Sequence, residues 1–314
     1  MTSIAREPSK LSLPRINPGV ETVLEYLILT FPTISAELWQ QRIDAGKIHW
    51  HDGSLIKVDS AYKAQQRVYY YREVEHEPKI PFTESILFED ELLLVAYKPH
   101  FLPVTAGGMY VNECLQNRLR HQTGIVTLQA LHRLDRVTAG LVLFAKDPAM
   151  RQPYHQLFAT QQIHKTYQAI ASLKLTAPHK IPVIGQQWEV KNRLIKADPS
   201  FTMRIATGQA NSHSIIRCIK QSADKCLFEL KPITGKTHQL RLHMQALGWP
   251  ILNDKYYPFL QQESADDYTK PLQLLAQQLE FIDPISQQYR IFNSNTELSL
   301  ETLPLPPAAP IKTQ

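Results

Sequence analysis

The stretch LHRLDRVTAGLVLFAKDPAMRQPYHQLFATQQIHKTYQAI, residues 131–170, is the most informative part of this 314-residue chain. Asp135 has Arg133 and Arg136 as close neighbours, and the apolar run Leu141–Ala145 follows directly. A carboxylate flanked by arginines at the entrance to a buried strand is held ionised and aimed in a fixed direction. In an arbitrary protein such a pair is more often a structural ion pair at a sheet edge. The surrounding sequence is therefore needed to decide whether Asp135 has a structural or a functional role.

Apolar runs on both sides of this stretch predict further strands. Long and varied connections separate them, without a regular alternation of strands and helices. This pattern favours an α+β fold, with a mostly antiparallel mixed sheet flanked by helices and loops. The predicted strands are residues 92–96, 141–145, 166–171, 214–220 and 227–230.

A helix is predicted for Thr237–Leu247, because Gly248 ends the run and apolar residues recur at helical spacing. The apolar stripe would bury one side of this helix. An adjacent polar stripe would be available to a cleft, and its members are His238, Arg241 and Gln245.

The string HRLDRVTAGLVLFAK, residues 132–146, closely resembles the signature of the RluA family, one class of RNA pseudouridine synthases. The family pattern is His-Arg-Leu-Asp, two residues, Thr-Ser-Gly and an apolar strand, and Ala139 replaces the serine. Three more segments resemble family motifs in the expected order, so the resemblance spans roughly residues 86–282. They are Tyr97–Gly108, the Lys-x-Tyr strand His164–Ile170, and Ile233–Asp254.

The resemblance implies an isomerase that detaches uracil from its ribose in RNA, rotates it and rejoins it through C5. Such a reaction involves no net redox change or hydrolysis, so no cofactor and no metal are expected. The sequence agrees, since it contains no phosphate-binding loop, no dinucleotide fingerprint and no Cys/His metal pattern.

By motif match, Asp135 is the expected catalytic carboxylate. It could attack C1′ of the ribose or C6 of the base, or remove the C2′ proton, and the sequence does not choose among these routes. Arg241 matches the family arginine that pairs with this aspartate, and a guanidinium can hold a carboxylate in a bidentate geometry. Tyr167 matches the tyrosine expected to stack on the target base and to take part in proton removal from C5.

A second group of residues is expected to contact RNA. Arg133 matches the residue that enters the base stack when the target nucleotide is flipped out. His132 would either contact RNA or brace its loop. Lys236 stands where the family usually has arginine, and Leu275 replaces a common family histidine in the last predicted motif. The remaining candidates for RNA contact are Arg136, Lys165 and His238.

The N-terminal part is expected to form a separate module. Helical periodicity over residues 20–31, a second helix at 36–45 and short strands at 47–50 and 67–72 resemble an S4-type RNA-binding module at residues 18–75. The alternative is a small adaptor without RNA contact. Around it we expect a flexible arm at residues 1–17, a linker at 76–85, the catalytic domain at 86–302 and a proline-rich tail at 303–314.

The formal net charge of +5 hides an uneven distribution. Residues 1–90 hold 10 basic and 13 acidic side chains, whereas residues 191–247 hold 10 and 3. The basic charge thus lies on the segments that carry the predicted site, as a phosphate-facing cleft requires. The three cysteines suit a reducing compartment, so we expect a cytoplasmic protein without membrane attachment, acting as a monomer with RNA as its partner and no obligate protein partner.

The leading hypothesis is therefore an RNA pseudouridine synthase that acts on structured RNA, with ribosomal RNA favoured over transfer RNA. The alternative is a non-catalytic RNA-binding or ribosome-assembly factor that retains the fold. A glycoside hydrolase is disfavoured, because that chemistry normally needs two carboxylates and the neighbours of Asp135 are basic.

Overall fold

The computed structural model describes residues 3–173 and 181–301 and divides into two compact units. The smaller unit comprises residues up to Pro78 together with Gly107–Asn112, and the larger comprises Lys79–Ala106 and the chain from Glu113 onward. The predicted tail at 303–314 lies outside the described residues.

Two short helices and small sheets form the smaller unit. The helix α1 begins at Thr22, whose side chain accepts a hydrogen bond from the Glu25 amide while the Glu25 carboxylate accepts one from Thr22. Ser35 caps α2, since its side chain accepts a hydrogen bond from the Leu38 amide. The elements are β1 (Ser3–Ile4), β2 (Ser9–Ser12), α1 (Val23–Thr30), α2 (Ala36–Asp44), β3 (Ile48–Trp50), β4 (Arg67–Tyr70) and β5 (Glu73–Val74).

The expected flexible arm at residues 1–17 is partly wrong. Ser9–Ser12 pairs antiparallel with Arg67–Tyr70, so β2 is an edge strand of the three-stranded sheet β2-β4-β3. Leu13, at the end of this strand, is buried in the core of the module. The prolines in this segment suggested a loose chain, but Pro8 and Pro14 lie just outside the strand, where they remove no ladder hydrogen bond.

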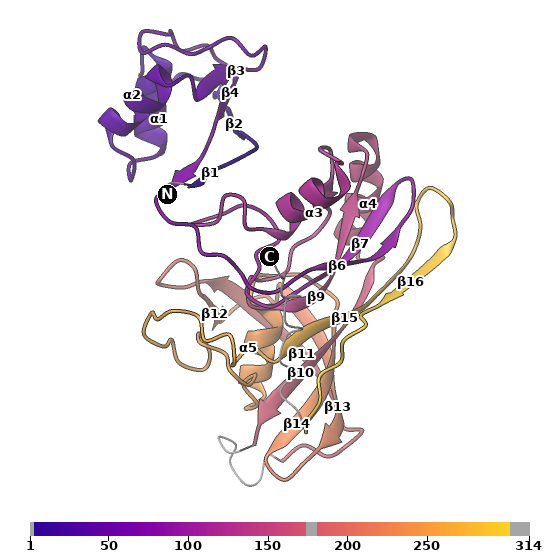
Figure 1. Ribbon diagram of the computed structural model, residues 1–314. Coiled ribbons are helices and arrows are strands. Elements are labelled where there is room, and N and C mark those ends of the chain that lie inside the picture. The colour runs from indigo at the N-terminus through magenta and orange to yellow at the C-terminus, as the bar shows by residue number, and fades with distance from the viewer. Residues whose placement is uncertain (1–2, 174–180, 302–314) are drawn as a thin grey trace, which may run out of the picture. The chain divides into compact units, whose positions relative to one another are not determined.

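One large sheet with helices beside it forms the larger unit (Figure 1). Its helices are α3 (Leu115–Thr123), η1 (Pro148–Met150, a 3-10 turn), α4 (Arg151–Ala159) and α5 (Gln239–Ala246). Its strands are β6 (Ser85–Glu89), β7 (Leu93–Lys98), β8 (Gln129–Ala130), β9 (Ala139–Ala145), β10 (His164–Ser172), β11 (Gln187–Lys196), β12 (Met203–Ala206), β13 (Ser212–Gln221), β14 (Lys225–Pro232), β15 (Leu274–Ile282) and β16 (Tyr289–Asn293).

The strand order places the predicted site strands near the middle of the sheet. The order is β12-β11-β13-β14-β10-β15-β9-β7-β6, with β16 paired to β15 and β8 to β9. Every pair among the described strands of this sheet is antiparallel except β15 with β9, so the predicted α+β class with a mostly antiparallel mixed sheet is confirmed.

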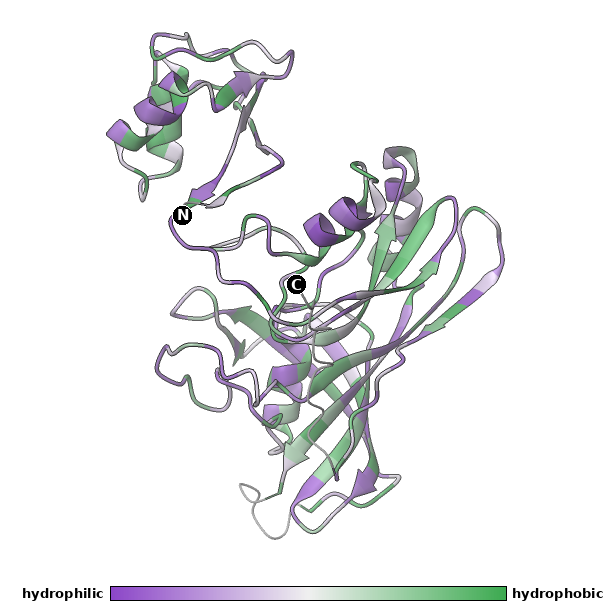
Figure 2. Ribbon diagram, in the orientation of Figure 1, coloured by the Kyte–Doolittle hydropathy of each residue, from purple (hydrophilic) through white to green (hydrophobic). Residues whose placement is uncertain are grey.

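Apolar runs in the sequence become buried strands, as Figure 2 shows for β7 and β9. All residues of β9 are buried, and α4 packs Tyr154 and Leu157 against Leu141 and Leu143 of this strand. On the other side of the unit, α5 packs Leu240 and Met244 into a second core cluster. These two clusters hold β9 and α5 in place. They therefore fix the loop before β9, which carries Asp135, and the residues of α5, which include Arg241.

The close contact of β9 with β15 explains the glycine of the Thr-Ala-Gly turn. Gly140 has a φ of +120° and lies opposite Ala276. A Cβ atom on Gly140 would lie 2.2 Å from the Ala276 carbonyl oxygen. This distance is too short for any residue that has a Cβ atom. Next to it, Ala139 faces Leu275 across the same parallel pair. Two of the departures from the family pattern are therefore neighbours within one apolar cluster. They are Ala139 in place of serine and Leu275 in place of histidine.

The predicted helix at Thr237–Leu247 is shorter than expected. His238 has a φ of +54°, in the left-handed region, so the helix begins at Gln239 and ends at Ala246. In the described part of the chain we found no helix long and apolar enough to cross a membrane.

Candidate active site

A cleft of about 870 Å³ opens beside the N-terminal end of β9. Its walls come from the loop before β9, from β10, from the segment between β14 and α5, and from α5 itself. The structure brings all nine predicted site residues together here, although they span more than 100 positions of the sequence. They are His132, Arg133, Asp135, Arg136, Lys165, Tyr167, Lys236, His238 and Arg241.

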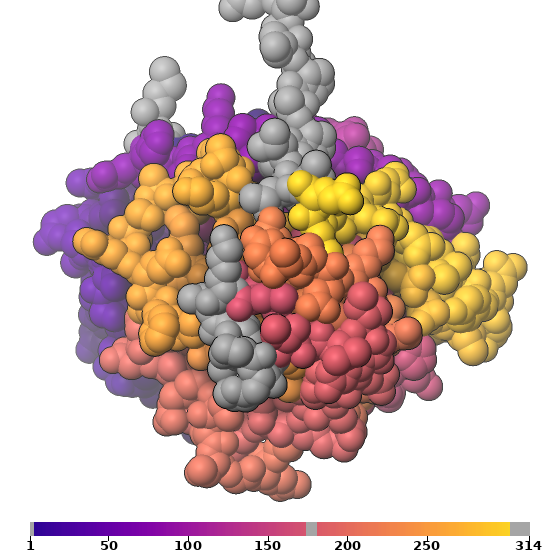
Figure 3. All heavy atoms as spheres, turned by 90° about the horizontal axis from the view of Figure 1, so that it is seen from below, coloured from indigo at the N-terminus to yellow at the C-terminus, as the bar shows by residue number. Residues whose placement is uncertain are grey.

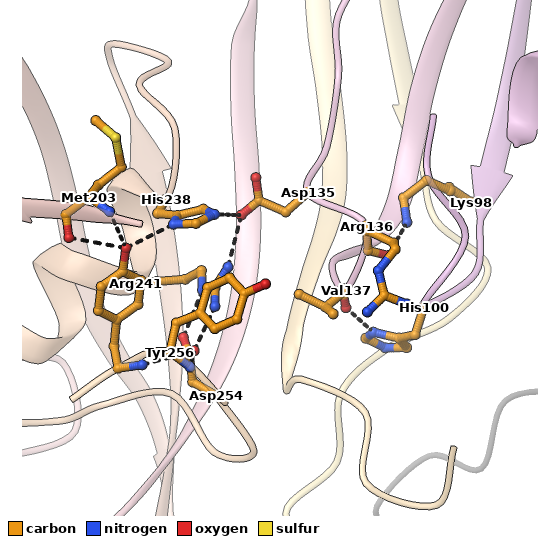
Figure 4. Close-up of polar contacts among 11 residues, drawn as sticks. Lys98, His100, Asp135, Arg136, Val137, Met203, His238, Arg241, Asp254 and Tyr256 are labelled. Carbon is orange, nitrogen blue, oxygen red and sulfur yellow. Dashed lines mark hydrogen bonds and ion pairs between the residues drawn. The ribbon is translucent and has the colours of Figure 1, made fainter. Parts of the chain in front are cut away.

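Asp135 lies between two groups of residues, with His238 and Arg241 on one side and Lys98 and His100 on the other (Figure 4). Its Oδ2 atom is 3.4 Å from Nη1 of Arg241 and 3.8 Å from Nε2 of His238. Its side chain is 28% exposed, so the carboxylate is reachable from the cleft. The amide of Thr138 donates to the Asp135 carbonyl oxygen and closes a turn that leads into β9.

Arg241 is almost fully buried and is held mainly by Asp254. Its Nε and Nη2 donate to the two Asp254 oxygens at 2.7 and 2.6 Å, and the rings of Tyr256 and Tyr257 lie 4.9 and 5.2 Å from the guanidinium carbon. Burial alone would disfavour the charge, but the hydrogen bonds to Asp254 outweigh it and raise the pKa of Arg241 above its usual range. The guanidinium is therefore a fixed cation.

The bidentate partner of Arg241 is thus not the one expected from the sequence. Arg241 reaches Asp135 through a single long contact, while both parallel bonds go to Asp254. A buried guanidinium needs a buried carboxylate, and the turn after α5 supplies it. Asp254 lies within the quoted segment Ile233–Asp254, so the requirement for a buried acid could have pointed to it.

His238 connects the cleft to the tyrosine pair. Its Nδ1 is 2.8 Å from the Tyr257 hydroxyl, which itself contacts the Met203 backbone. Burial lowers the pKa of His238, so the ring is neutral near neutral pH. At 3.8 Å its contact with Asp135 is too long for a hydrogen bond, and for a neutral ring it is not an ion pair.

Tyr167 stands on β10, where the pairing with β15 shifts register between Thr166 and Tyr167. Its hydroxyl makes no hydrogen bond with a described residue, and its ring packs against the second core cluster. Burial, together with the negative charge of Asp135, raises the pKa of Tyr167. The phenol is therefore protonated and free to contact a molecule in the cleft.

On the other side of Asp135, two buried residues hold the loop that carries it (Figure 4). The Lys98 ammonium donates to the carbonyl oxygens of Pro99, Leu102 and Arg136 at 2.9, 2.6 and 3.0 Å. Nδ1 of His100 donates to the Val137 carbonyl at 2.7 Å. Burial lowers the pKa of both side chains, that of His100 to about 4. Neither was singled out from the sequence, because their targets are backbone atoms that no side-chain pattern reveals.

For His132, the structure favours the bracing role. Its Nε2 accepts a hydrogen bond from the Leu143 amide at 3.1 Å, and its ring lies 5.0 Å from that of Phe158. Burial lowers the pKa of His132 to about 3, so it remains neutral. Because its Nε2 atom is bonded to the Leu143 amide of β9, His132 supports the loop.

Apart from Arg241, the arginines and lysines of the cleft fall into two groups. Arg136 is engaged within the protein, since its two terminal nitrogens contact Asp266 at 2.6 and 3.0 Å. The other three make no side-chain hydrogen bond or ion pair with any residue that the structure describes, and they remain available to phosphates. These are Arg133, Lys165 and Lys236. Across the described ranges, no group of three or more His, Cys, Asp or Glu side chains could hold a metal ion.

Comparison with solved structures places this fold among the pseudouridine synthases. The chain is 25% identical to the human RNA pseudouridylate synthase domain containing 4 protein, with a TM-score of 0.51 over 68% of this chain and 88% of that one. For the human domain containing 1 protein, the identity is 22% and the TM-score 0.54, over 70% and 86% of the two chains.

The sequence comparisons are more specific. A family model described as RNA pseudouridylate synthase matches residues 92–246. The chain is 31% identical to the dual-specificity RNA pseudouridine synthase RluA of Vibrio vulnificus, over 68% of this chain and 83% of the relative. It is 30% identical to the ribosomal large subunit pseudouridine synthase C of Rickettsia bellii, over 78% and 79%. The chain belongs to the RluA family of RNA pseudouridine synthases, which are isomerases.

Proposed function

We propose that this enzyme converts specific uridines in structured RNA to pseudouridine with Asp135 as its catalytic carboxylate, and that ribosomal RNA is its preferred substrate. The observation that carries the assignment is the position of Asp135, which faces a fixed guanidinium and a protonated tyrosine in one cleft. Three cations without a partner among the described residues line the same cleft and would meet the phosphates on either side of the target.

The reaction breaks the bond between N1 and C1′ and forms a bond between C5 and C1′. N1 gains a proton and C5 loses one, so atoms and charge balance without a redox partner. Asp135 would act by attack at C1′ or C6, or by removing the C2′ proton. In each route its carboxylate must be ionised and correctly aimed at the start, and the contact of Arg241 with Oδ2 leaves Oδ1 as the attacking atom.

Tyr167 would contribute in the second half of the reaction. While Asp135 is charged, the Tyr167 hydroxyl is held protonated by burial and by that charge. Formation of a covalent bond to Asp135, or its protonation, removes the negative charge and makes the hydroxyl a better acid. Tyr167 would therefore keep its proton in the first half of the reaction. It would exchange this proton with the uracil ring only after Asp135 has reacted.

The target uridine must leave its stack before Asp135 can reach it. Arg133 is exposed at the mouth of the cleft and is free of partners among the described residues. It would stack on the neighbouring bases and replace part of the lost stacking energy. Lys165 and Lys236 would neutralise flanking phosphates from the opposite wall.

The preference for ribosomal RNA is supported by the relative from Rickettsia bellii, which is named as a ribosomal large subunit pseudouridine synthase. An S4-like role for the N-terminal module would add affinity for structured RNA. Mapping pseudouridines in total RNA from cells with and without the gene tests this preference, since the lost positions identify the substrate directly.

The catalytic assignment is tested with purified Asp135→Asn protein on the RNA found in this way. We expect unchanged RNA binding and at least a thousandfold loss of pseudouridine formation, roughly the size of other single-residue losses of an essential catalytic group. Normal product formation by this variant would overturn the role of Asp135. Absence of product from the wild type as well would instead favour a non-catalytic RNA-binding factor.

A further inference from the structure

A second cavity of about 360 Å³ lies on the other side of the tyrosine pair from Asp135. Tyr256 and Tyr257 contact Arg241 on one side and line this second pocket on the other. The rest of the wall is largely apolar and comes from β12, from α5 and from the residues after Tyr257. Arg241 lines the active-site cleft, so the pocket and the cleft are connected through the packed side chains of Arg241, Tyr256 and Tyr257.

Gln245 supplies an amide to this pocket and explains part of the polar stripe on α5. His238 and Arg241 of that stripe face the active-site cleft, whereas Gln245 lines the second pocket. Its buried Oε1 atom has no hydrogen-bond partner among the described residues. Because no bond fixes the amide, rotation about its last side-chain bond can present either a donor or an acceptor to a molecule in the pocket.

Polar and aromatic groups surround the mouth of the pocket. Arg204 and Asp198 line it, both are exposed, and neither makes an ion pair or side-chain hydrogen bond with a described residue. Phe201 is 54% exposed and lies 5.4 Å from the ring of Tyr256. Figure 3 shows the orange segment that follows α5 lying beside the salmon strands of this region.

We propose that this second pocket binds an unpaired nucleobase of the RNA that flanks the target uridine, a proposal that rests on the proposed function. The volume suits one nucleotide, the aromatic rings offer stacking surfaces, and a free amide can read the edge of a base. Arg204 would contact the adjoining phosphate, and Asp198 would accept a hydrogen bond from an exocyclic amino group. Adenine, cytosine and guanine carry such a group and uracil does not.

The position of the pocket supports this choice of ligand. Residues 191–247, which form most of its walls, carry an excess of seven basic side chains, so a polyanion is attracted to this region. Arg241 lines the cleft and contacts Tyr256 and Tyr257, which line the pocket, so a nucleotide near the one in the cleft would be within reach of the pocket. A second base held in this way would select the uridine by its sequence neighbours, whereas the cleft recognises the uridine itself.

A direct test uses the methyl group of Met203, which lines the pocket. The chain contains five methionines, so selective ¹³C-methyl labelling gives a simple spectrum in which Met203→Leu identifies the signal. We expect millimolar 5′-AMP to shift the Met203 resonance, with a smaller shift for 5′-UMP and none for inorganic phosphate. Gln245→Leu should abolish the shift, whereas Gln221→Leu, an exposed amide on β13 outside the pocket, should retain it.

This measurement does not depend on activity, so it fails separately from the proposed function. An unmoved Met203 signal, equal shifts with phosphate, or an unchanged response in Gln245→Leu would each overturn the pocket assignment. If the wild-type protein forms no pseudouridine, that result counts against the catalytic assignment and not against the pocket.

A second test uses the substrate RNA. In an oligoribonucleotide that wild-type protein modifies, flanking bases are removed one at a time to leave abasic sites. One position should raise KM about tenfold for wild-type enzyme, the size expected for one stacked base. The same abasic site should have no effect in Gln245→Leu. Equal sensitivity of Gln245→Leu and wild type at every position would refute the proposal.

Discussion

Asp254 is the residue on which the orientation of Arg241 depends. The carboxylate of Asp254 is buried, accepts both parallel bonds from the guanidinium and also accepts from the amides of Tyr256 and Tyr257. Arg241 could be identified from a sequence motif. The role of Asp254 follows only from the folded structure, in which the turn after α5 brings its carboxylate to Arg241. Asp135, the proposed catalytic carboxylate, therefore contacts a guanidinium whose orientation is set by Asp254.

Asp254→Asn should both destabilise the protein and impair the reaction. It leaves a buried guanidinium without its counter-charge, which costs about 3–5 kcal/mol of unfolding free energy. Urea unfolding and pseudouridine formation would measure the two effects. As a control, Asp266→Asn removes the partner of Arg136, a pair whose side chains are 32% and 18% exposed, and should cost no more than about 1 kcal/mol. Equal losses in both variants would contradict the role given to Asp254.

His100 is expected to act as a positioning residue for the loop that carries Asp135. Leucine at this position removes the hydrogen bond to the Val137 carbonyl, and a small displacement of Asp135 should lower kcat by roughly 10- to 100-fold with little change in KM. His100→Asn keeps a donor at nearly the same place and should restore most of kcat. If the leucine and asparagine variants have the same kcat, the hydrogen bond does not position the loop.

At the scale of elements, the parallel contact between β9 and β15 sets the geometry of the catalytic turn. Gly140 allows the two backbones to approach, and Ala139 and Leu275 fill the space beside it. These two departures from the family pattern therefore change residues packed beside the turn, whereas a third departure, Lys236 in place of arginine, lines the cleft.

Gly140→Ala should be severely destabilising. Its Cβ atom would overlap the Ala276 backbone, and backbone cannot rotate away, so we expect a loss of roughly 3 kcal/mol or more and poor recovery of folded protein. Gly107→Ala is the matched control, since nothing lies within 4 Å of its added Cβ. Thermal unfolding of both variants would check this, and a Gly140→Ala protein as stable as the control would refute it.

Sequence patterns revealed the elements whose side chains are uniformly buried or regularly alternating. The runs at 141–145 and 166–171 became β9 and β10, because a strand in the middle of a sheet needs apolar residues. The strands β6, β8, β11, β12 and β16 were missed, since their residues are largely exposed or half-buried, and β15 was noticed only as a motif. Site residues carried by motifs were found together in the cleft, but their buried partners Lys98, His100 and Asp254 depend on tertiary contacts.

For the whole molecule, buried neutral histidines predict a loss of stability in acid. Burial lowers the pKa of His100 and His243 to about 4 and that of His132 to about 3, while an unfolded chain has histidines near 6.5. Between pH 6.5 and about 4 the unfolded chain therefore binds protons that the folded one does not. The unfolding free energy should fall as the pH is lowered through this window.

We expect the unfolding free energy at pH 5 to be roughly 6 kcal/mol lower than at pH 7.5, about 2 kcal/mol for each of the three histidines, measured by urea unfolding. In His132→Gln an amide oxygen can accept from the Leu143 backbone without titrating, so this variant should lose less stability between the two pH values. A flat stability profile from pH 7.5 to 5 in the wild type would show that these histidines are accessible to protons.

The position of β15 in the sheet also bears on how the enzyme is made. This strand lies between β10 and β9, although more than 100 residues separate it from either in the chain. During synthesis, β9 and Asp135 leave the ribosome long before residues 274–282 can join them. Contacts between such distant segments form slowly, because a long loop must close before they contribute. The turn that carries Asp135 therefore reaches its final geometry among the last events of folding, after residues 274–282 have been made.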